Sequence, residues 1–376
     1  MLNLEKIKSA MQHLGLTQMA LAKDCSVSKE AVSNWLAGES IPRPNKLKAL
    51  AAALQLEIEN LIVTDSASEP VVAYRMRRNR MPTGAALEAA QDQAHHLKQL
   101  VPFIRRETVF APPVLESPRL DDEYIREAAR QVRAKNGIGL TAPVSRNELL
   151  NLLHDFGALL VPVFWGKERD GHENALSVYL PDSKTSWVVF NLNAKNDDFN
   201  YWLAHELGHC YTLHTLQGDD GEEFAERFAQ ELLFPIEAAA EAMTLINSAP
   251  VKRDQANWFA GKYEVSVITV LKQVDRVAEQ AGLPPTGIQT KSFWASWNTT
   301  RHLVPSVAHE LFGHENITVS DYVTTCEQKF RTPVFEAIAS WQQQEGGRSP
   351  AFIVGALNID LGLAFELSHQ LSAAAD

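Results

Sequence analysis

Residues 205–209 read His-Glu-Leu-Gly-His, which places two metal-ligand side chains and a possible general base within about one helical turn. Side chains four residues apart lie on one face of an α-helix, so His205 and His209 can bind the same ion. The pattern is typical of zinc peptidases, in which the ion lowers the pKa of a bound water toward about 7. We therefore expect Glu206 to take a proton from that water for attack on a peptide carbonyl, and then to protonate the leaving amine.

A third protein ligand is needed, because catalytic zinc is usually held by three side chains with a fourth position open. A second helix is predicted over residues 222–235, where apolar residues recur at helical spacing and a proline ends the pattern. Its acidic side chains supply the candidates. Glu222 and Glu226 lie four apart and share a face, so the spacing alone leaves both open.

The segments before the motif supply the elements that would position it. A buried strand is predicted over residues 187–192, and residues 199–204 lead into the motif with apolar side chains at helical spacing. A strand followed by an active-site helix is the arrangement of zincins, which commonly bind a substrate peptide as an added strand. By this analogy the peptide would lie beside residues 188–192, and Asn191 is expected to face it.

Residues 228–235 read Phe-Ala-Gln-Glu-Leu-Leu-Phe-Pro. With the His-Glu-x-x-His motif, they resemble the ImmA/IrrE metallopeptidases, whose signature is Phe-Ala-x-x-Leu-Leu-x-Pro; the resemblance covers about residues 120–285. It implies a zincin-like domain with a small sheet and an active-site helix, and Zn²⁺ as the cofactor. It also implies Glu222 as the third ligand, because the family's ligand stands six residues before the signature Phe. The family often has Asn where this chain has Glu226, which leaves Glu226 as a substitute ligand or as a hydrogen-bond partner of a ligand histidine.

Two other groups of histidines are predicted to lie outside the metal site. His214 follows His209 by five residues, whereas the third histidine of a metzincin follows by six. His309 and His314 are five residues apart, which turns their side chains about 140° from each other on a helix. Neither spacing suits a shared ion.

A different function is predicted near the start of the chain. Residues 17–38 read as helix, short turn and helix, with a Ser28 cap at the start of the second helix. The expected core residues are Ala20, Leu21, Ala31, Val32 and Trp35. About residues 4–63 resemble the XRE (Cro/repressor-type) helix-turn-helix domain. Ser26 departs from the family, which usually has a turn Gly there, and a positive φ at a serine would cost free energy.

The second helix of this pair has a polar outer face, as a helix that enters the major groove requires. A phosphate contact is expected from Gln18 at the start of the first helix. The predicted DNA-binding residues are Gln18, Ser28, Lys29, Glu30, Ser33, Asn34 and Arg43. Because basic and acidic residues nearly balance in this region, a protein-binding helical bundle with the same core is the alternative.

The 376 residues and their 45% hydrophobic content suit two or three domains with real cores. We expect a helix-turn-helix domain over residues 1–63, a linker with a connecting helix over 64–118, a metallopeptidase domain over 119–286 and a C-terminal module over 287–376. The fold class is therefore α+β multidomain. It combines an all-α N-terminal domain, a zincin-like domain and an α+β C-terminal module that could sense a ligand or pair subunits, or that simply packs on the peptidase.

Charge and cysteine content limit the setting. The net charge of −11 disfavours indiscriminate binding to nucleic acid or membranes, so DNA contact should be local to the N-terminal domain. Three cysteines make no disulfide framework and indicate a reducing cytoplasm. The apolar stretch 351–367 is interrupted by Asn358 and Asp360, so it is predicted to be buried core and not a membrane span.

The sequence thus predicts a cytoplasmic regulator that joins a DNA-binding domain to a zinc endopeptidase. Its expected partners are a double-stranded DNA operator, which repressor-type domains usually bind as homodimers, and a repressor-type protein substrate. Cleavage of that protein, or of the chain itself, would serve a stress or prophage response. The alternative is a non-catalytic transcription factor or antitoxin that uses a peptidase-like fold as a ligand or partner sensor.

Overall fold

The computed structural model divides the chain into two compact units, Met1–Glu69 and Pro70–Asp376. Each unit has its own apolar core. The structure describes the whole chain except residues 1, 38–39, 41, 43, 57–60, 62–67, 74–83, 106–112, 165–174, 289–290, 292, 294, 296–298, 300, 314–316, 345–348 and 374–376.

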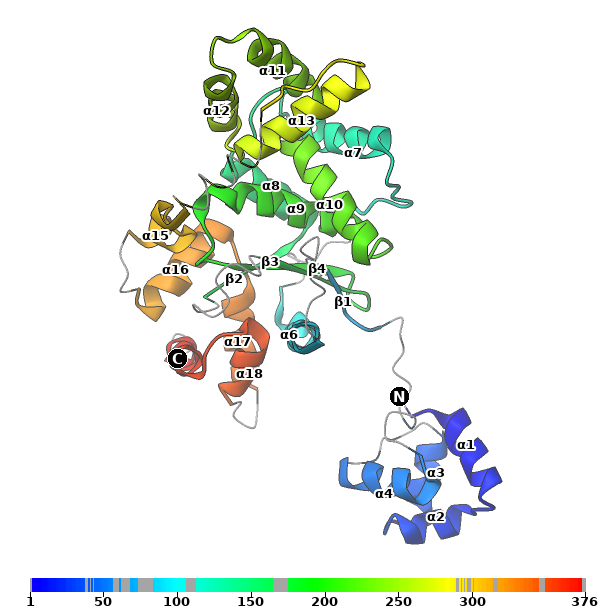
Figure 1. Cartoon of the computed structure of the whole chain (residues 1–376). Helices are drawn as coiled ribbons and strands as arrows, with labels where there is room; N and C mark the ends of the chain where they lie inside the picture. The colour runs from blue at the N-terminus through cyan, green and yellow to red at the C-terminus, as the bar shows by residue number, and fades with distance from the viewer. Residues whose placement is uncertain are drawn as a thin grey trace. The chain divides into compact units, whose positions relative to one another are not determined.

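The first unit is built from helices (Figure 1). Its described helices are α1 (Leu4–His13), α2 (Gln18–Asp24), α3 (Lys29–Ala37) and α4 (Pro44–Leu54). The hydroxyl oxygen of Thr17 accepts from the Ala20 amide at 3.2 Å, and that of Ser28 accepts from the Ala31 amide at 3.2 Å. The predicted helix, turn and helix are therefore confirmed, with both N-termini capped.

The core of this unit agrees with the prediction except at its alanines; Ala31 packs against the core but is only half-buried. Leu21, Val32 and Trp35 are buried, as expected. Ala22 is also buried, whereas Ala20 is only half-buried. The inward face of α2 is therefore rotated by about one residue from the predicted one, which periodicity in a seven-residue helix does not resolve.

Ser26, in the turn between α2 and α3, has φ = 51° and so adopts the left-handed conformation. This explains why a glycine would suit the position, because a Cβ is strained there. The Lys46 ammonium donates to the carbonyl oxygens of Cys25 and Ser26, both at 3.0 Å, and so holds the turn in place. These are backbone acceptors, which any substitution at Ser26 retains.

Ser26→Gly should stabilise the first unit by about 0.5–1 kcal/mol. Glycine removes the strain of the left-handed conformation, and this gain exceeds the cost of the greater conformational freedom of glycine in the unfolded chain. Ser33→Gly, at an exposed position in α3, is the matched control and should be destabilising. Hydrogen exchange of the amides of residues 4–54 in the full chain measures both. Slower exchange in Ser33→Gly than in Ser26→Gly would contradict the strain argument.

The second unit is organised around a four-stranded sheet with the strand order β1-β3-β4-β2 (Figure 1). Strand β4 pairs in parallel with β2 and antiparallel with β3, and β3 pairs antiparallel with β1. All seven residues of β4 are buried, because helices cover both faces of the sheet and β4 lies inside it. The strands are β1 (Val71–Ala73), β2 (Leu159–Val163), β3 (Ala175–Leu180) and β4 (Thr185–Asn191).

One face of the sheet carries the helices that hold the metal-ligand motif (Figure 1). Helix α9 (Phe199–Thr212) contacts β3 and packs against α10 (Gly218–Leu233) and α8 (Arg146–Phe156). Helix α7 (Asp122–Lys135) packs on α10. The predicted strand, the helix that carries the His-Glu-x-x-His motif and the second helix are therefore confirmed as elements. Beyond them lie α11 (Ile236–Ser248), α12 (Lys252–Tyr263) and α13 (Val267–Gln280), which pack on one another.

Arg133 of α7 fixes the carboxyl end of α10. Its side chain is only 1% exposed, and burial lowers the pKa of its guanidinium. It donates to the carbonyl oxygens of Leu232, Gly139 and Ala142. A buried arginine bound to backbone carbonyls costs free energy if its partners move, so this contact holds α10 in one position against α7.

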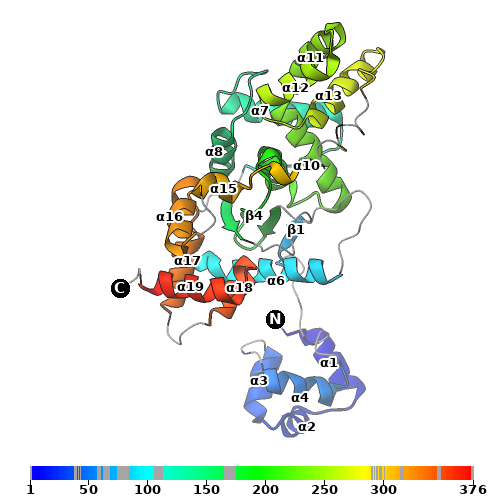
Figure 2. The same cartoon turned by 60° about the vertical axis from the view of Figure 1, so that its left-hand side comes forward.

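The other face of the sheet is covered by α6 (Gly84–Leu100) and by helices from the end of the chain (Figure 2). Helix α17 contacts β2 and α6, and α18 packs on α6. The terminal helices are α15 (Val307–Phe312), α16 (Val319–Phe330), α17 (Val334–Gln342), α18 (Ala351–Leu357) and α19 (Leu361–Ala373), and the short 3₁₀ turns are Val101–Phe103, Asn196–Asp198 and Arg301–Leu303.

Two predictions about domain organisation are wrong. The segment 64–118 is not a linker as a whole, because β1 and α6 belong to the sheet and its cover. The module 287–376 is not α+β in its described part, where every regular element is a helix. It shares the core of the second unit, in agreement with the alternative that it packs on the preceding domain. Short apolar runs do not distinguish strand from buried helix, and the faces that these segments cover are formed by distant parts of the chain.

Within the described residues no single helix is both long and apolar enough to span a membrane, while α18 and α19 pass that test only as a pair bent by 106°. Ile353, Leu357 and Leu367 of these helices are buried in the core, as predicted for this stretch. The three cysteines, Cys25, Cys210 and Cys326, are free and buried.

Candidate metal centre

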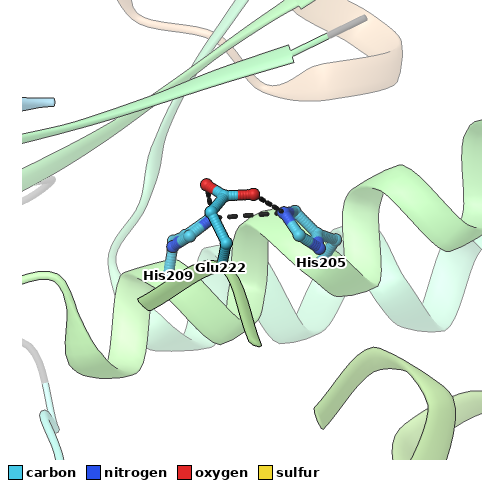
Figure 3. A group of neighbouring side chains, drawn as sticks. All are labelled: His205, His209 and Glu222. Carbon is cyan, nitrogen blue, oxygen red and sulfur yellow. Dashed lines mark hydrogen bonds and ion pairs between the residues drawn. The ribbon is translucent and has the colours of Figure 1, made fainter. Parts of the chain in front are cut away.

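The two histidines of the motif lie side by side within helix α9. His205 is 1% exposed and His209 is 2% exposed, because α9 is covered by the sheet, α8 and α10. Their Nε2 atoms are 3.1 Å apart and point to the same place (Figure 3). The four-residue spacing thus brings two imidazole nitrogens to one point, as the sequence predicted.

Glu222 completes the cluster from α10. Its carboxylate lies 3.1 Å from His209 Nε2 and 3.5 Å from His205 Nε2, bridging the two imidazoles (Figure 3). One ligand atom from each of the three residues lies within 4.8 Å of the others. A tetrahedral ion with bonds of 2.0–2.2 Å separates its ligand atoms by roughly 3.3–3.6 Å. The donor set and its spacing therefore fit zinc.

Glu226 lies outside this cluster. Among the described residues, the group that can share an ion consists of His205, His209 and Glu222. The Nδ1 atoms of both histidines are buried and have no hydrogen-bond partner in the described structure, so Glu226 does not bond to them either. Of the two candidates that the spacing left open, the structure brings Glu222 to the two histidines.

Glu222 and His209 shift each other's pKa in opposite directions. Burial opposes ionisation of Glu222, but hydrogen bonds from His205 and His209 lower its pKa to about 2. Burial likewise opposes protonation of His209, but its hydrogen bond and charge interaction with Glu222 raise its pKa overall. A carboxylate that stabilises an imidazolium in this way also suits a divalent cation, which would displace that proton.

Glu206 is held by a residue that the sequence analysis did not identify. The Ser177 hydroxyl of β3 donates to Glu206 Oε2 at 2.6 Å, and both side chains are buried. The sequence offered one indication of this contact: Ser177 lies within an apolar strand, and a buried hydroxyl needs a hydrogen-bond partner. The contact fixes the carboxylate of the predicted general base against the face of the sheet at β3.

Gly208, inside the motif, allows α10 to approach α9. A Cβ at this position would lie 2.9 Å from Ala225 Cα and 3.3 Å from a ring carbon of Phe228. The first of these atoms belongs to the backbone, which cannot turn aside. The close approach is what places Glu222 beside the two histidines.

Gly208→Ala should therefore destabilise the protein by about 1–3 kcal/mol and weaken zinc binding, because α10 must move away from α9. Gly261→Ala in α12 is the matched control, since a Cβ there meets nothing within 4 Å, and it should stabilise by up to about 1 kcal/mol. Urea unfolding and a competition titration with a zinc chelator measure the two effects. Unchanged zinc affinity in Gly208→Ala would reject the packing argument.

The prediction for Asn191 is wrong in its geometry. Strand β4 is paired on both sides, by β3 and by β2, so a peptide cannot add to it. Asn191 is 1% exposed, and its side-chain oxygen accepts from the Asn193 amide at 3.0 Å. The sequence could not show this, because strand order depends on pairing between distant segments.

His214 and His309 lie outside the cluster. His214 is half-buried, and its ring lies against Tyr179 with centroids 6.2 Å apart. Burial lowers the pKa of His214. His309 is exposed on α15, and His314 lies outside the described residues.

The predicted DNA-binding residues lie where a reading helix would present them. Ser28, Lys29, Glu30, Ser33 and Asn34 are exposed on or beside α3. Gln18 is half-buried at the start of α2, and Arg43 lies outside the described residues.

Comparison with known proteins bears on the N-terminal unit. The helix-turn-helix family HTH_3 matches residues 7–61. The chain therefore carries an XRE-type helix-turn-helix domain at its N-terminus and is a DNA-binding transcription regulator. No curated protein matches the chain. A similar solved structure is that of ComR from S. thermophilus in complex with DNA and its signalling peptide ComS, with 12% identity, 99% of each chain covered and a TM-score of 0.15.

Proposed function

We propose that the second unit is a zinc-dependent endopeptidase of the ImmA/IrrE type, and that the regulator combines it with operator binding. The observation that carries this proposal is the convergence of His205, His209 and Glu222 beside a buried Glu206. The two histidines and the glutamate would hold the ion. Bound there, zinc would supply Lewis acidity toward a peptide carbonyl and toward water.

The chain's own residues would divide the remaining work. Glu206, adjacent to His205 in the motif, would accept a proton from the attacking water and return it to the leaving amine. Ser177 would orient Glu206 by donating to Oε2, the contact seen at 2.6 Å. Burial of α9 would exclude other water and strengthen the electrostatic interactions of the site.

The helix-turn-helix unit would direct this chemistry to gene regulation. We propose that it binds a double-stranded operator as a homodimer, through Lys29, Ser33 and Asn34 of α3. The protein substrate would be a repressor-type protein or the chain itself, cleaved in a stress or prophage response in the cytoplasm.

The test is a metal assay followed by a cleavage assay. The purified full chain should bind one zinc per protomer, and it should cleave a pool of quenched-fluorescent peptides only when zinc is present. Removal of zinc with a chelator should abolish cleavage, and added zinc should restore it. A chain that never holds zinc, even when supplied with it, would instead favour a non-catalytic regulator that uses this fold as a sensor.

A further inference from the structure

The edge of strand β3 beside the metal centre is occupied by a segment of the chain itself. Strand β1 pairs antiparallel with β3, with Val71 opposite Tyr179, Val72 opposite Val178 and Ala73 opposite Ser177. Strand β4 pairs with the other edge of β3. In the described sheet, β1 is the end strand next to β3.

This pairing places β1 next to the residues of the proposed site. Ser177, which donates to Glu206, is the register partner of Ala73. Directly opposed residues of an antiparallel pair extend to the same face of the sheet, so Ala73 lies on the face that carries α9. Ala73 is 8% exposed, and β1 also contacts α10, the helix that carries Glu222.

An extended peptide binds a sheet by adding a strand to an exposed edge, where main-chain hydrogen bonds supply the affinity. Here β3 carries Ser177, which contacts Glu206, and β1 already takes the backbone hydrogen bonds of β3 on the side away from β4. We infer that β1 is a built-in competitor: it occupies the peptide-binding edge of β3 and keeps the metal centre closed to extended substrates until it is displaced. The inference rests on the proposed peptidase function and specifies its regulation.

The form of β1 suits a displaceable strand. It is three residues long, Val71 and Val72 are only half-buried, and it lies at the end of the sheet. Few hydrogen bonds must break to release it. It also begins two residues after the boundary between the two compact units, so a change in the DNA-binding unit has a short covalent path to it.

A covalently attached strand excludes free peptides efficiently. A short tether holds a segment near its binding site at an effective concentration in the millimolar range. A free peptide at micromolar concentration therefore competes poorly with β1 when the two segments have similar intrinsic affinity for β3. Weakening β1 alone should therefore open the site without a change in any metal ligand.

The test compares two double variants of the full chain. The first variant, Val71→Pro with Val72→Pro, removes two backbone N–H donors. The N–H groups of successive strand residues point to opposite sides, so one of the two removed N–H groups is the one that points toward β3. Val71→Ile with Val72→Ile keeps both donors and the β-branched side chains, so it is the matched control. Both pairs should bind zinc as the parent chain does, because neither changes a ligand.

Two measurements do not depend on catalysis. Those amides of residues 176–180 that point toward β1 should exchange at least tenfold faster in the proline pair than in the parent or the isoleucine pair, whereas the amides that point toward β4 should be unchanged. A fluorescein-labelled peptide with the sequence of residues 68–76 should bind the proline pair at least tenfold more tightly than it binds the parent, by anisotropy. The binding assay is done with Glu206→Gln added to each chain, so that the peptide is not consumed.

The third measurement is cleavage of the peptide pool, for which kcat/KM should rise at least tenfold in the proline pair only. Equal peptide binding by the parent and the proline pair, or faster exchange without new peptide binding, would overturn the inference. If the proline pair binds peptide but no zinc-loaded chain cleaves anything, the edge competition stands while the peptidase proposal fails. If the parent cleaves as fast as the proline pair, the peptidase proposal stands and the competition by β1 is rejected.

Discussion

Replacing Glu222 with glutamine should weaken zinc binding at least about 100-fold, whereas Glu226→Gln should leave it within about threefold. Removal of a residue that only hydrogen-bonds to a metal ligand typically lowers metal affinity about 10–100-fold. The loss expected here is larger, because Glu222 supplies a ligand atom and the only negative charge of the three-residue cluster. The two glutamates lie one turn apart on the same helix, so the pair separates ligand loss from a change in the charge of α10.

The measurement is a competition titration with a chromophoric zinc chelator at pH 7.5, with circular dichroism to show that the helices persist. Glutamine has nearly the size of glutamate, so the side-chain packing should survive. Below the raised pKa of His209, the parent should also lose zinc affinity because protons compete with zinc for this imidazole. Glu222→Gln should show a weaker pH dependence, because the carboxylate that stabilises the imidazolium is gone. A larger loss from Glu226→Gln than from Glu222→Gln would assign the third ligand to Glu226 and contradict the geometry seen here.

The sequence predicted the local parts of the site because they depend on local geometry. The four-residue spacing of His205 and His209 needs only a helix, and the apolar run of β4 needs only a buried strand. The XRE resemblance correctly marked the strained turn at Ser26, because a left-handed position in a short turn leaves a glycine preference in related sequences. Such features are set by a few consecutive residues.

The parts of the site and fold that depend on packing between distant segments were harder to predict from the sequence. Glu222 and Glu226 could not be separated by spacing, since the choice depends on how α10 crosses α9 at Gly208. Ser177 meets Glu206 only after β3 has paired beside β4. The three-residue strand β1 gives almost no periodic signal, and it pairs with residues about one hundred positions away. The terminal helices looked ambiguous because their apolar runs are short and the face they cover comes from α6 and the sheet.

Glu206→Gln should abolish peptide cleavage and leave zinc in place. The side chain lies outside the three-residue cluster that fits the ion, so stoichiometric zinc should remain in the purified variant. Glutamine retains an oxygen that can accept from Ser177, so the hydrogen bond at 2.6 Å has a replacement and the fold should persist. What is lost is the ability to take a proton, and removal of a general base typically lowers the rate by about 10²–10⁴-fold.

The matched control for this variant is Glu223→Gln, an exposed residue of α10 that pairs with Arg227 at 3.1 Å. It makes the same change of charge near the site and should leave kcat within about twofold. Both variants are best measured in the chain that also carries Val71→Pro and Val72→Pro, because the highest activity is expected there.

A Glu206→Gln chain that cleaves at the parent rate would show that another group removes the proton. A chain that loses zinc together with activity would show that Glu206 shapes the metal cluster itself. Loss of activity with zinc retained would separate the two roles that adjacent residues of one helix are expected to play, with His205 holding the ion and Glu206 moving the proton.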